Sequence, residues 1–342
     1  MKSAEALSLG RARARLARSA PSPDSSLPIL ENFRTTAAAA GWFRRKALDR
    51  SAFHPEFLEE VEILRYRPAR RCTLRLRFGG PADRCVYVKV CRPGRAERIA
   101  RDLESLRALG PWPDLRVPPV LALVPEEGIV ILGELAGAGL DERLAEVADP
   151  GREVVEAARA IARLHSLPLS CARTWTAADE MAVLRTRRPF LHGRVDLARE
   201  GVEEVYRRIA VGAALLDALP RAPLHRDLHP QQILLDGSSG GLVDFDEMAG
   251  GPAEIDLGNL LAHLDLYAVY LPAGAARIEE AARGLVAAYE RRRALHLPAL
   301  MIARAASLIR LACLYAAAPG LADLTPPLVT RAERLLAPAE LS

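Results

Sequence analysis

Two aspartates on either side of a short apolar hairpin are the feature that most constrains the fold of this chain. Residues 224–235 read L-H-R-D-L-H-P-Q-Q-I-L-L, and residues 242–246 read L-V-D-F-D. The apolar runs in these segments are separated by G-S-S-G-G, which predicts a β-hairpin. Such a hairpin would hold Asp227 and Asp244 on either side of one small volume.

The residue types around this hairpin suit phosphoryl transfer. Asp227 stands two residues after His225, and the amide side chain of Gln232 follows five residues later. This spacing is close to that of a kinase catalytic loop followed by its metal-binding aspartate. The reaction needs a carboxylate to accept the hydroxyl proton and oxygen ligands to hold Mg²⁺ against the phosphates. Aspartates beside turns also cap helices or close turns, but two motifs in this order around a hairpin favour a catalytic site.

The chain resembles the aminoglycoside phosphotransferase and choline kinase-like family, the small-molecule branch of the protein-kinase fold. The resemblance is carried by H-R-D-L-H-P at 225–230, V-D-F-D at 243–246 and D-L-G at 256–258. The family usually shows H-G-D-x-x-x-x-N, then I-D-F or I-D-W, then D-L-A. The resemblance implies an α+β, two-lobed protein-kinase-like fold, with a small β-rich N-lobe and a larger, mostly helical C-lobe.

The resemblance makes Asp227 the catalytic carboxylate and makes Gln232 and Asp244 the ligands of Mg²⁺. Gln232 replaces the usual asparagine; its amide oxygen suits Mg²⁺ but sits on a side chain one methylene longer. Arg226 stands where most relatives carry glycine, which leaves the loop conformation open. Asp256 is expected either to hold the catalytic loop by accepting backbone N–H bonds or to cap the helix that follows.

Lysine is rare in this chain, which draws attention to Lys89. Only three of the 47 basic residues are lysines, and Lys89 lies inside the strand-like run V-Y-V-K-V. Valines fill one face of that strand. If this face packs against the helix predicted over 95–109, Lys89 faces the cleft and contacts nucleotide phosphates. The alternative is a solvated strand lysine. The resemblance also implies an acid partner for Lys89 on this helix, where Glu97, Asp102 and Glu104 compete.

Two further nucleotide contacts are predicted. The turn R-P-A-R-R-C at 67–72 contains no glycine, so arginine side chains, Arg71 among them, are candidates to supply phosphate donors in place of backbone N–H groups; a solvated turn is the alternative. Glu134 follows the apolar strand predicted over 128–132, and the resemblance makes this stretch the hinge whose backbone bonds adenine. An ordinary strand-to-loop transition is the alternative.

The order of elements along the chain is strands first and mostly helices later, which suits two lobes. We expect an N-terminal extension over 1–50, a β-rich nucleotide-binding N-lobe over 51–134 and a C-lobe over 135–342. His165, at the end of a predicted helix, is expected to be a helix-end or core histidine rather than a catalyst. Asp246 either assists the metal or closes a turn.

Composition narrows the partners and the compartment. The net charge is only +4, with acidic and basic residues interspersed, which argues against nucleic-acid binding. No apolar run reaches the roughly 18 residues that span a bilayer, so no membrane partner is expected. The five cysteines show no metal-ligand spacing and fit a reduced, cytoplasmic chain. The sequence leaves the oligomeric state open.

The sequence therefore predicts an ATP-dependent phosphotransferase that moves the γ-phosphate to a hydroxyl of a small molecule, such as an antibiotic, a sugar or an amino alcohol. Asp265, Glu279 and Glu280 in the C-terminal helices could bind a cationic substrate, although charged helix faces are usually just solvated. The alternative function is a nucleotide-binding regulatory module with the same fold and no catalysis. A protein kinase is disfavoured, because no A-P-E signature follows Asp244.

Overall fold

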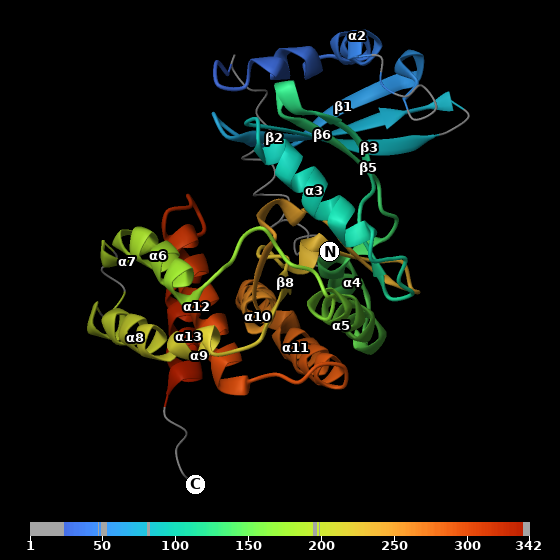
Figure 1. Cartoon of the computed structure of the whole chain (residues 1–342). Helices are drawn as coiled ribbons and strands as arrows, with labels where there is room; N and C mark the ends of the chain where they lie inside the picture. Colours follow the sequence, from blue (N-terminus) through green and yellow to red (C-terminus); the bar gives the residue numbers. More distant parts are fainter. Residues whose placement is uncertain are drawn as a thin grey trace. The chain divides into compact units, whose positions relative to one another are not determined.

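The chain divides into two compact units, one built on a sheet and the other mostly helical (Figure 1). This computed structural model describes residues 24–337 except 47, 49–52, 81–82, 194–196 and 198. Unit 1 runs to Pro111 and resumes over Arg116–Ala136, and unit 2 comprises Trp112–Leu115 and the chain from Gly137 onward. The structure thus confirms the expected α+β fold with a β-rich and a helical lobe.

Unit 1 is centred on a five-stranded antiparallel sheet with the order β1-β2-β3-β6-β5. Alternating apolar residues predict the second and third strands, and both are present. The register places Lys89 opposite Thr73 on one side and Val130 on the other. The strands are β1 (Leu58–Arg67), β2 (Arg71–Phe78), β3 (Arg84–Cys91), β5 (Val120–Val124) and β6 (Ile129–Gly133).

The valine face of β3 packs against the helices that precede the sheet, η1 (Pro28–Phe33) and α2 (Thr36–Lys46). Trp42 is only 1% exposed and lies in this core. The sequence pattern predicts an extension over residues 1–50, but residues 28–46 belong to the core of unit 1, because their apolar side chains cover the sheet.

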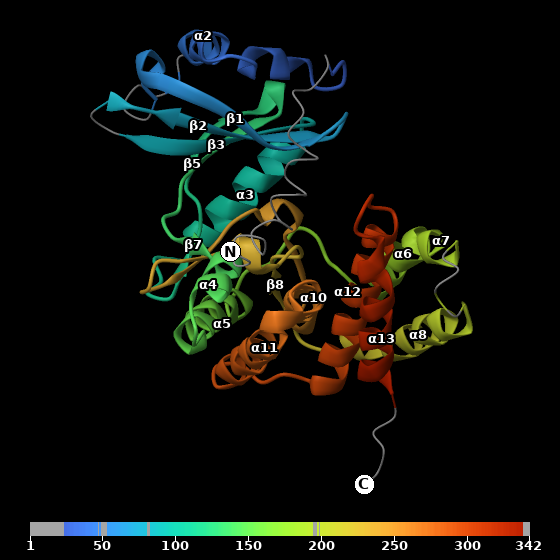
Figure 2. The same ribbon diagram turned by 180° about the vertical axis from the view of Figure 1, so that it is seen from behind.

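Helix α3 (Arg95–Arg107) packs on the opposite face of the sheet from α2, as Figure 2 shows from behind. The expectation that the valine face packs against this helix is therefore wrong. Lys89 lies on the other face of β3 and is 6% exposed, so it is not a solvated strand lysine. Buried ammonium groups require polar or charged company.

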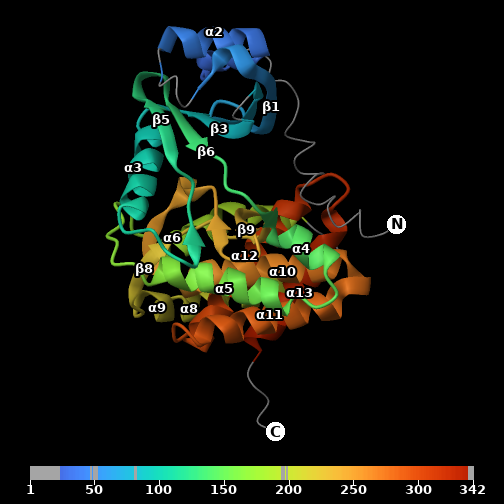
Figure 3. The same cartoon turned by 90° about the vertical axis from the view of Figure 1, so that its right-hand side faces the viewer.

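Unit 2 is built from helices that run through most of its length (Figure 3). Helix α10 is buried along almost all of its length and packs against both α11 and α12. The irregular helical region predicted between residues 174 and 219 resolves into four short helices. The helices are α4 (Leu140–Glu146), α5 (Gly151–His165), α6 (Ala177–Arg187), α7 (Pro189–His192), α8 (Arg199–Gly212), α9 (Ala214–Asp217), α10 (Glu254–Tyr270), α11 (Ala275–Glu290), α12 (Leu297–Ala316) and α13 (Thr325–Leu336).

The predicted hairpin is present in unit 2 as two short antiparallel strands. Leu242 pairs with Ile233, and Gly240 pairs with Leu235. The turn needs Gly237, whose φ of 87° lies in the left-handed region. Buried Glu156 on α5 accepts the N–H groups of Asp236 and Gly237, which anchors the turn. The strands of unit 2 are β7 (Ala138–Gly139), β8 (Arg221–Leu224), β9 (Ile233–Leu235), β10 (Gly240–Leu242) and β11 (Ala249–Pro252), with β4 (Leu115–Arg116) at the unit boundary.

Helix α12 is long and apolar enough, by length and composition, to cross a membrane. Its apolar stretch is interrupted by Arg304 and Arg310, and 67% of it is buried inside the structure. A mostly buried helix of this kind is typical of the core of a soluble protein.

Candidate active site

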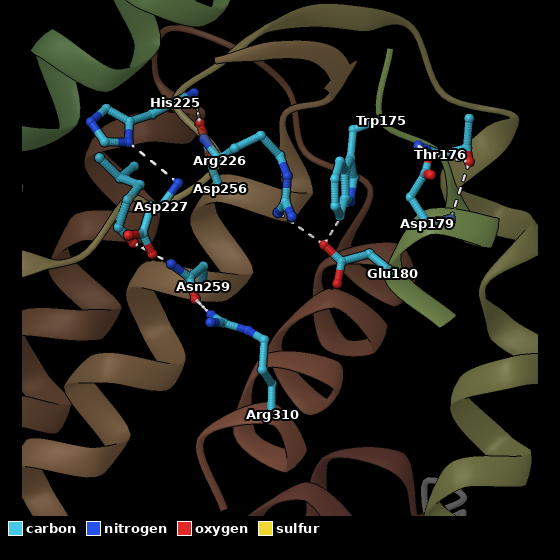
Figure 4. Close-up of polar contacts among 11 residues, drawn as sticks. Trp175, Thr176, Asp179, Glu180, His225, Arg226, Asp227, Asp256, Asn259 and Arg310 are labelled. Carbon is cyan, nitrogen blue, oxygen red and sulfur yellow. Dashed lines mark hydrogen bonds and ion pairs between the residues drawn. The ribbon is translucent and has the colours of Figure 1, made fainter. Parts of the chain in front are cut away.

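The predicted catalytic loop begins directly after β8, and one buried carboxylate accepts its first backbone N–H groups. Asp256 accepts the backbone N–H of His225 at 2.6 Å and that of Arg226 at 2.8 Å (Figure 4). Helix α10 begins at Glu254, with Ala253 as its N-cap, so Asp256 lies inside the first turn and is not the cap. The predicted loop-holding role of Asp256 is therefore confirmed.

Two buried histidines complete this support. His225 Nε2 lies 2.7 Å from the carbonyl oxygen of Val243, which can only accept, so Nε2 carries the proton. Its Nδ1 then accepts the N–H of Asp227 at 3.4 Å. His165, at the end of α5, bonds Asp256 at 3.2 Å and the hydroxyl of Tyr289 at 2.8 Å. Its predicted role as a core histidine is confirmed.

Asp256 carries its negative charge at full burial. Burial raises the pKa of this carboxyl, but the hydrogen bonds from His165 and from the N–H of His225 help to hold the pKa below its usual value. An ionised carboxylate is the stronger acceptor for the two loop N–H groups. The loop is therefore fixed at its start by charge-assisted bonds.

Arg226 has a backbone conformation that favours glycine. Its φ is 71°, in the left-handed region that costs a residue with a Cβ about 1 kcal/mol. The side chain compensates through two contacts that a glycine lacks. Its guanidinium lies 3.6 Å from the ring centroid of Trp175 and donates to Glu180 at 2.9 Å (Figure 4). Trp175 also donates to Glu180, at 2.9 Å.

This compensation gives a testable pair of variants. Arg226→Ala removes the side-chain contacts with Trp175 and Glu180 and keeps the backbone strain. Arg226→Gly removes the contacts and the strain. We therefore expect the glycine variant to be more stable than the alanine variant by about 1 kcal/mol. Denaturant unfolding of both proteins measures the difference. An alanine variant as stable as the glycine variant would show that the left-handed conformation carries no cost here.

Asp227 is half-buried at the centre of the loop. Burial and the charge of Asp244 raise the pKa of its carboxyl, but the nearby charges of His229 and Arg310 outweigh them and hold the pKa below its usual value. Asn259 on α10 also supports the loop, because its side-chain amide donates to the carbonyl oxygen of Leu228 at 2.8 Å. Asp227 is therefore ionised at neutral pH and held in a supported loop.

The two predicted metal ligands lie together at the base of the hairpin. The amide nitrogen of Gln232 donates to Asp244 Oδ2 at 3.3 Å and lies 3.2 Å from His229 Nε2. The backbone also pairs here, because the N–H of Val243 donates to the carbonyl oxygen of Gln232 at 3.0 Å. Asp244 has a φ of 69° and occupies the N-cap position of the short helix η6 (Phe245–Glu247) without a side-chain capping bond. Asp246 is buried within η6.

The other predicted residues belong to unit 1, so the structure groups the site residues into two sets. Lys89 is buried on the α3 face of the sheet, and Arg71 is the first residue of β2. Glu134 follows β6 with an exposed side chain. The glycine-free turn between β1 and β2 is tied to Asp24, which accepts the N–H of Ala69 at 2.8 Å. That N–H is thus engaged within unit 1.

The structure distinguishes among the three acids of α3 that are candidates to pair with Lys89. Glu97 is engaged at the start of the helix, where it accepts the N–H of Gly94 at 2.7 Å. Glu104 is exposed, whereas Asp102 is half-buried.

Several residues of the site are not predicted from the sequence. Arg310 on α12 donates to the amide oxygen of Asn259, and its charge acts on Asp227. Trp175, just before α6, and Glu180, in its first turn, hold Arg226. A charged residue inside an apolar helix such as α12 is a signal that could have pointed to Arg310. Trp175 and Glu180 carry no comparable local pattern.

Comparison with known proteins identifies the family. The model of a family described as "Phosphotransferase enzyme family" matches residues 73–295, which is more than half of the chain. No match was found among curated proteins.

Solved structures share the fold at low sequence identity. A choline/ethanolamine kinase family protein from Mesorhizobium loti is 17% identical, with a TM-score of 0.58 and coverage of 87% of this chain and 96% of that chain. Choline kinase LicA from Streptococcus pneumoniae is 13% identical, with a TM-score of 0.56 and coverage of 87% and 98%. A thermostable mutant of the aminoglycoside phosphotransferase APH(4)-Ia is 15% identical, with a TM-score of 0.57 and coverage of 82% and 94%.

These structures confirm the two-lobed protein-kinase-like fold, and the family match confirms the resemblance carried by the sequence motifs. The match covers the strand of Lys89, the catalytic loop and the hairpin. The chain belongs to the phosphotransferase enzyme family.

Proposed function

We propose that this phosphotransferase is an ATP-dependent kinase that transfers the γ-phosphate to a hydroxyl of a small molecule. The observation that carries the proposal is the catalytic loop of unit 2. Asp256 fixes the backbone of this loop, Asp227 is ionised within it, and Gln232 stands beside Asp244 at its end. A carboxylate base next to oxygen ligands for a metal is what phosphoryl transfer requires.

Asp227 acts as the base in this proposal. Its carboxylate orients the acceptor hydroxyl and takes the hydroxyl proton as the oxygen attacks the γ-phosphorus. The lowered pKa keeps the carboxylate ready to accept that proton at neutral pH. The bonds from Asp256 and Asn259 to the loop backbone hold the base in place, so little reorganisation is needed during the reaction.

The residues present fit Mg²⁺. The ion prefers hard oxygen ligands and is commonly bound by one or two protein side chains together with phosphates and water. Asp244 offers a carboxylate and Gln232 an amide oxygen, and their side chains meet at 3.3 Å. Among the described residues no group of three or more acidic, histidine or cysteine side chains forms a metal site, which suits an ion held largely by nucleotide. When bound, Mg²⁺ would neutralise charge on the phosphates.

Gln232 must turn to serve as a ligand. Its amide nitrogen now points at Asp244, and a rotation about the terminal bond exchanges nitrogen for oxygen. His229, which lies against the same amide nitrogen, would then lose this contact.

Two solved structures support ATP as donor. Aminoglycoside phosphotransferase APH(2'')-Ib is described in an ADP-bound form, with a TM-score of 0.50. A streptomycin–ATP–APH(2'')-IIa ternary complex has a TM-score of 0.53. In this proposal Lys89 and Arg71 contact the phosphates, the backbone near Glu134 bonds adenine, and Asp102 is the acid that pairs with Lys89.

Lys89→Met tests the phosphate contact. Methionine keeps most of the apolar length and volume and removes the charge, so we expect weaker ATP binding or slower transfer with a small change in the melting temperature. Calorimetric ATP titration, steady-state kinetics and thermal unfolding separate these effects. Normal kinetics with a strongly destabilised protein would make Lys89 a structural residue of unit 1 instead.

A screen of purified protein tests the function itself. ATP consumption is measured with Mg²⁺ across hydroxylated metabolites, sugars, amino alcohols and antibiotics, with Asp227→Asn as the blank. Acceptor-dependent consumption by the parent alone supports the kinase. Magnesium-dependent ATP binding without consumption supports the non-catalytic regulatory module.

We further propose a cytoplasmic enzyme, because no disulfide joins any of its five cysteines, all of which lie in described segments.

A further inference from the structure

Arg310 is a half-buried cation without a carboxylate partner. Its Nη2 donates to the neutral amide oxygen of Asn259, and among the described residues no ion pair joins it to an acid. Other half-buried arginines of unit 2 form ion pairs with carboxylates. The pairs are Arg226 with Glu180, Arg304 and Arg331 with Asp265, and Arg188 with Glu203.

A second guanidinium adds to this charge. Arg187, at the end of α6, acts electrostatically on Arg310, and within the described part of the chain it too has no ion pair. Arg226 is the third cation near Arg310, and the acids that act on Arg310 are Asp227 and Glu180. Arg310 and Arg187 are thus two guanidinium groups without an ion-pair partner among the described residues, and the charge of Arg310 acts on Asp227.

Two of the three acids predicted as possible partners of a cationic acceptor, Asp265 and Glu279, are already engaged. Asp265 receives both Nε and Nη2 of Arg304 at 2.7 Å and is 2% exposed. Arg331 bridges Asp265 at 3.0 Å and Glu279 at 2.8 Å. These acids are neutralised by contacts within the helix bundle, so they are poorly suited to bind an ammonium group.

We propose that Arg310, assisted by Arg187, binds a carboxylate of the acceptor, so that the substrate is a hydroxy acid rather than an amine. The inference rests on the proposed function and names the substrate class of the same site. A planar guanidinium recognises a carboxylate through two parallel N–H bonds. Asp227 and Arg310 interact without forming an ion pair, so the base and the anion-binding group remain separate.

Matched acceptors test the substrate class. The acids glycerate, gluconate and glucuronate are compared with the neutral glycerol and glucose and with the amines 3-aminopropane-1,2-diol and glucosamine. Transfer from Mg·ATP and calorimetric binding are both measured. We expect the acids to be preferred. Arg310→Gln should lower kcat/KM for the preferred acid by about tenfold or more, chiefly through KM, because a charged hydrogen-bond partner is lost. Neutral acceptors should lose less, because only the action of Arg310 on Asp227 changes for them.

The variants separate substrate binding from support of the fold. Glutamine can still donate to Asn259, which protects the local structure, and Arg310→Lys should be intermediate because it keeps the charge and loses the fork. Arg304→Gln on the same helix is the matched control. It should lower the melting temperature without changing the ratio of acid to amine turnover, because Arg304 is paired with Asp265.

Preference for amines, or a failure of every acid to bind, would overturn the proposal. So would an Arg310→Gln variant that lowers kcat equally for all acceptors, because Arg310 would then act only through Asp227. Acid binding that depends on Arg310 without any phosphate transfer would uphold the anion site and reject the kinase function.

Discussion

Replacing Asp227 by asparagine is expected to lower turnover by about 10²–10⁴-fold while the fold and nucleotide binding survive. Asparagine has nearly the same shape, and the loop is held by bonds from Asp256 and Asn259 that do not involve the Asp227 side chain. What is lost is the ionised group that accepts the hydroxyl proton. Single-turnover kinetics, with ATP affinity measured in parallel, isolate that step.

Asp236 offers a matched control for this variant. Its carboxylate lies in the hairpin turn, where it accepts the N–H of Ser238 at 2.9 Å, and it has no place in the proposed chemistry. Asp236→Asn should therefore keep near-parental turnover. If Asp227→Asn also turned over at the parental rate, the catalytic role of Asp227 would be rejected.

Replacing Gln232 by leucine is expected to lower magnesium-dependent transfer by about a hundredfold or more, because a metal ligand contributes several kcal/mol. Gln232→Asn keeps an amide oxygen at a shifted position and should retain measurable activity. Asparagine keeps an amide oxygen that can bind a metal, whereas leucine has none. Rates measured across a range of Mg²⁺ concentrations compare both variants with the parent.

Asp244→Ala serves as the companion to these variants. It should remove the Mg²⁺-dependent strengthening of ATP binding in calorimetric titrations. Parental activity in the leucine variant would exclude Gln232 as a ligand. Identical ATP affinity of the Asp244 variant and the parent, with and without Mg²⁺, would exclude Asp244.

The parts of the fold that the sequence predicts well are those set by local patterns. The hairpin follows from two apolar runs around glycines, and β2 and β3 follow from alternation with a period of two. A loop-holding role could be proposed for Asp256 because it stands at a fixed place in D-L-G. Only the structure, in which α10 begins at Glu254, distinguishes this role from helix capping.

The parts that the sequence does not predict depend on contacts between distant segments. The valines of β3 could have packed against either neighbouring helix, and the choice of α2 depends on Trp42 and its apolar neighbours. Arg310 reaches the catalytic loop only because α12 packs against α10. Arg226 tolerates a left-handed backbone because Trp175, 51 positions earlier in the chain, receives its side chain. No local rule gives such pairings.

The most direct test follows the phosphate itself. The purified protein is incubated with ATP labelled with ¹⁸O in the γ-phosphate, Mg²⁺ and the acceptor panel, and the acceptors are analysed by mass spectrometry. The account predicts a labelled phosphate attached to an acceptor oxygen, present with the parent and lost with Asp227→Asn. Magnesium-dependent ATP binding with no labelled acceptor anywhere in the panel would contradict it and favour a non-catalytic nucleotide-binding module.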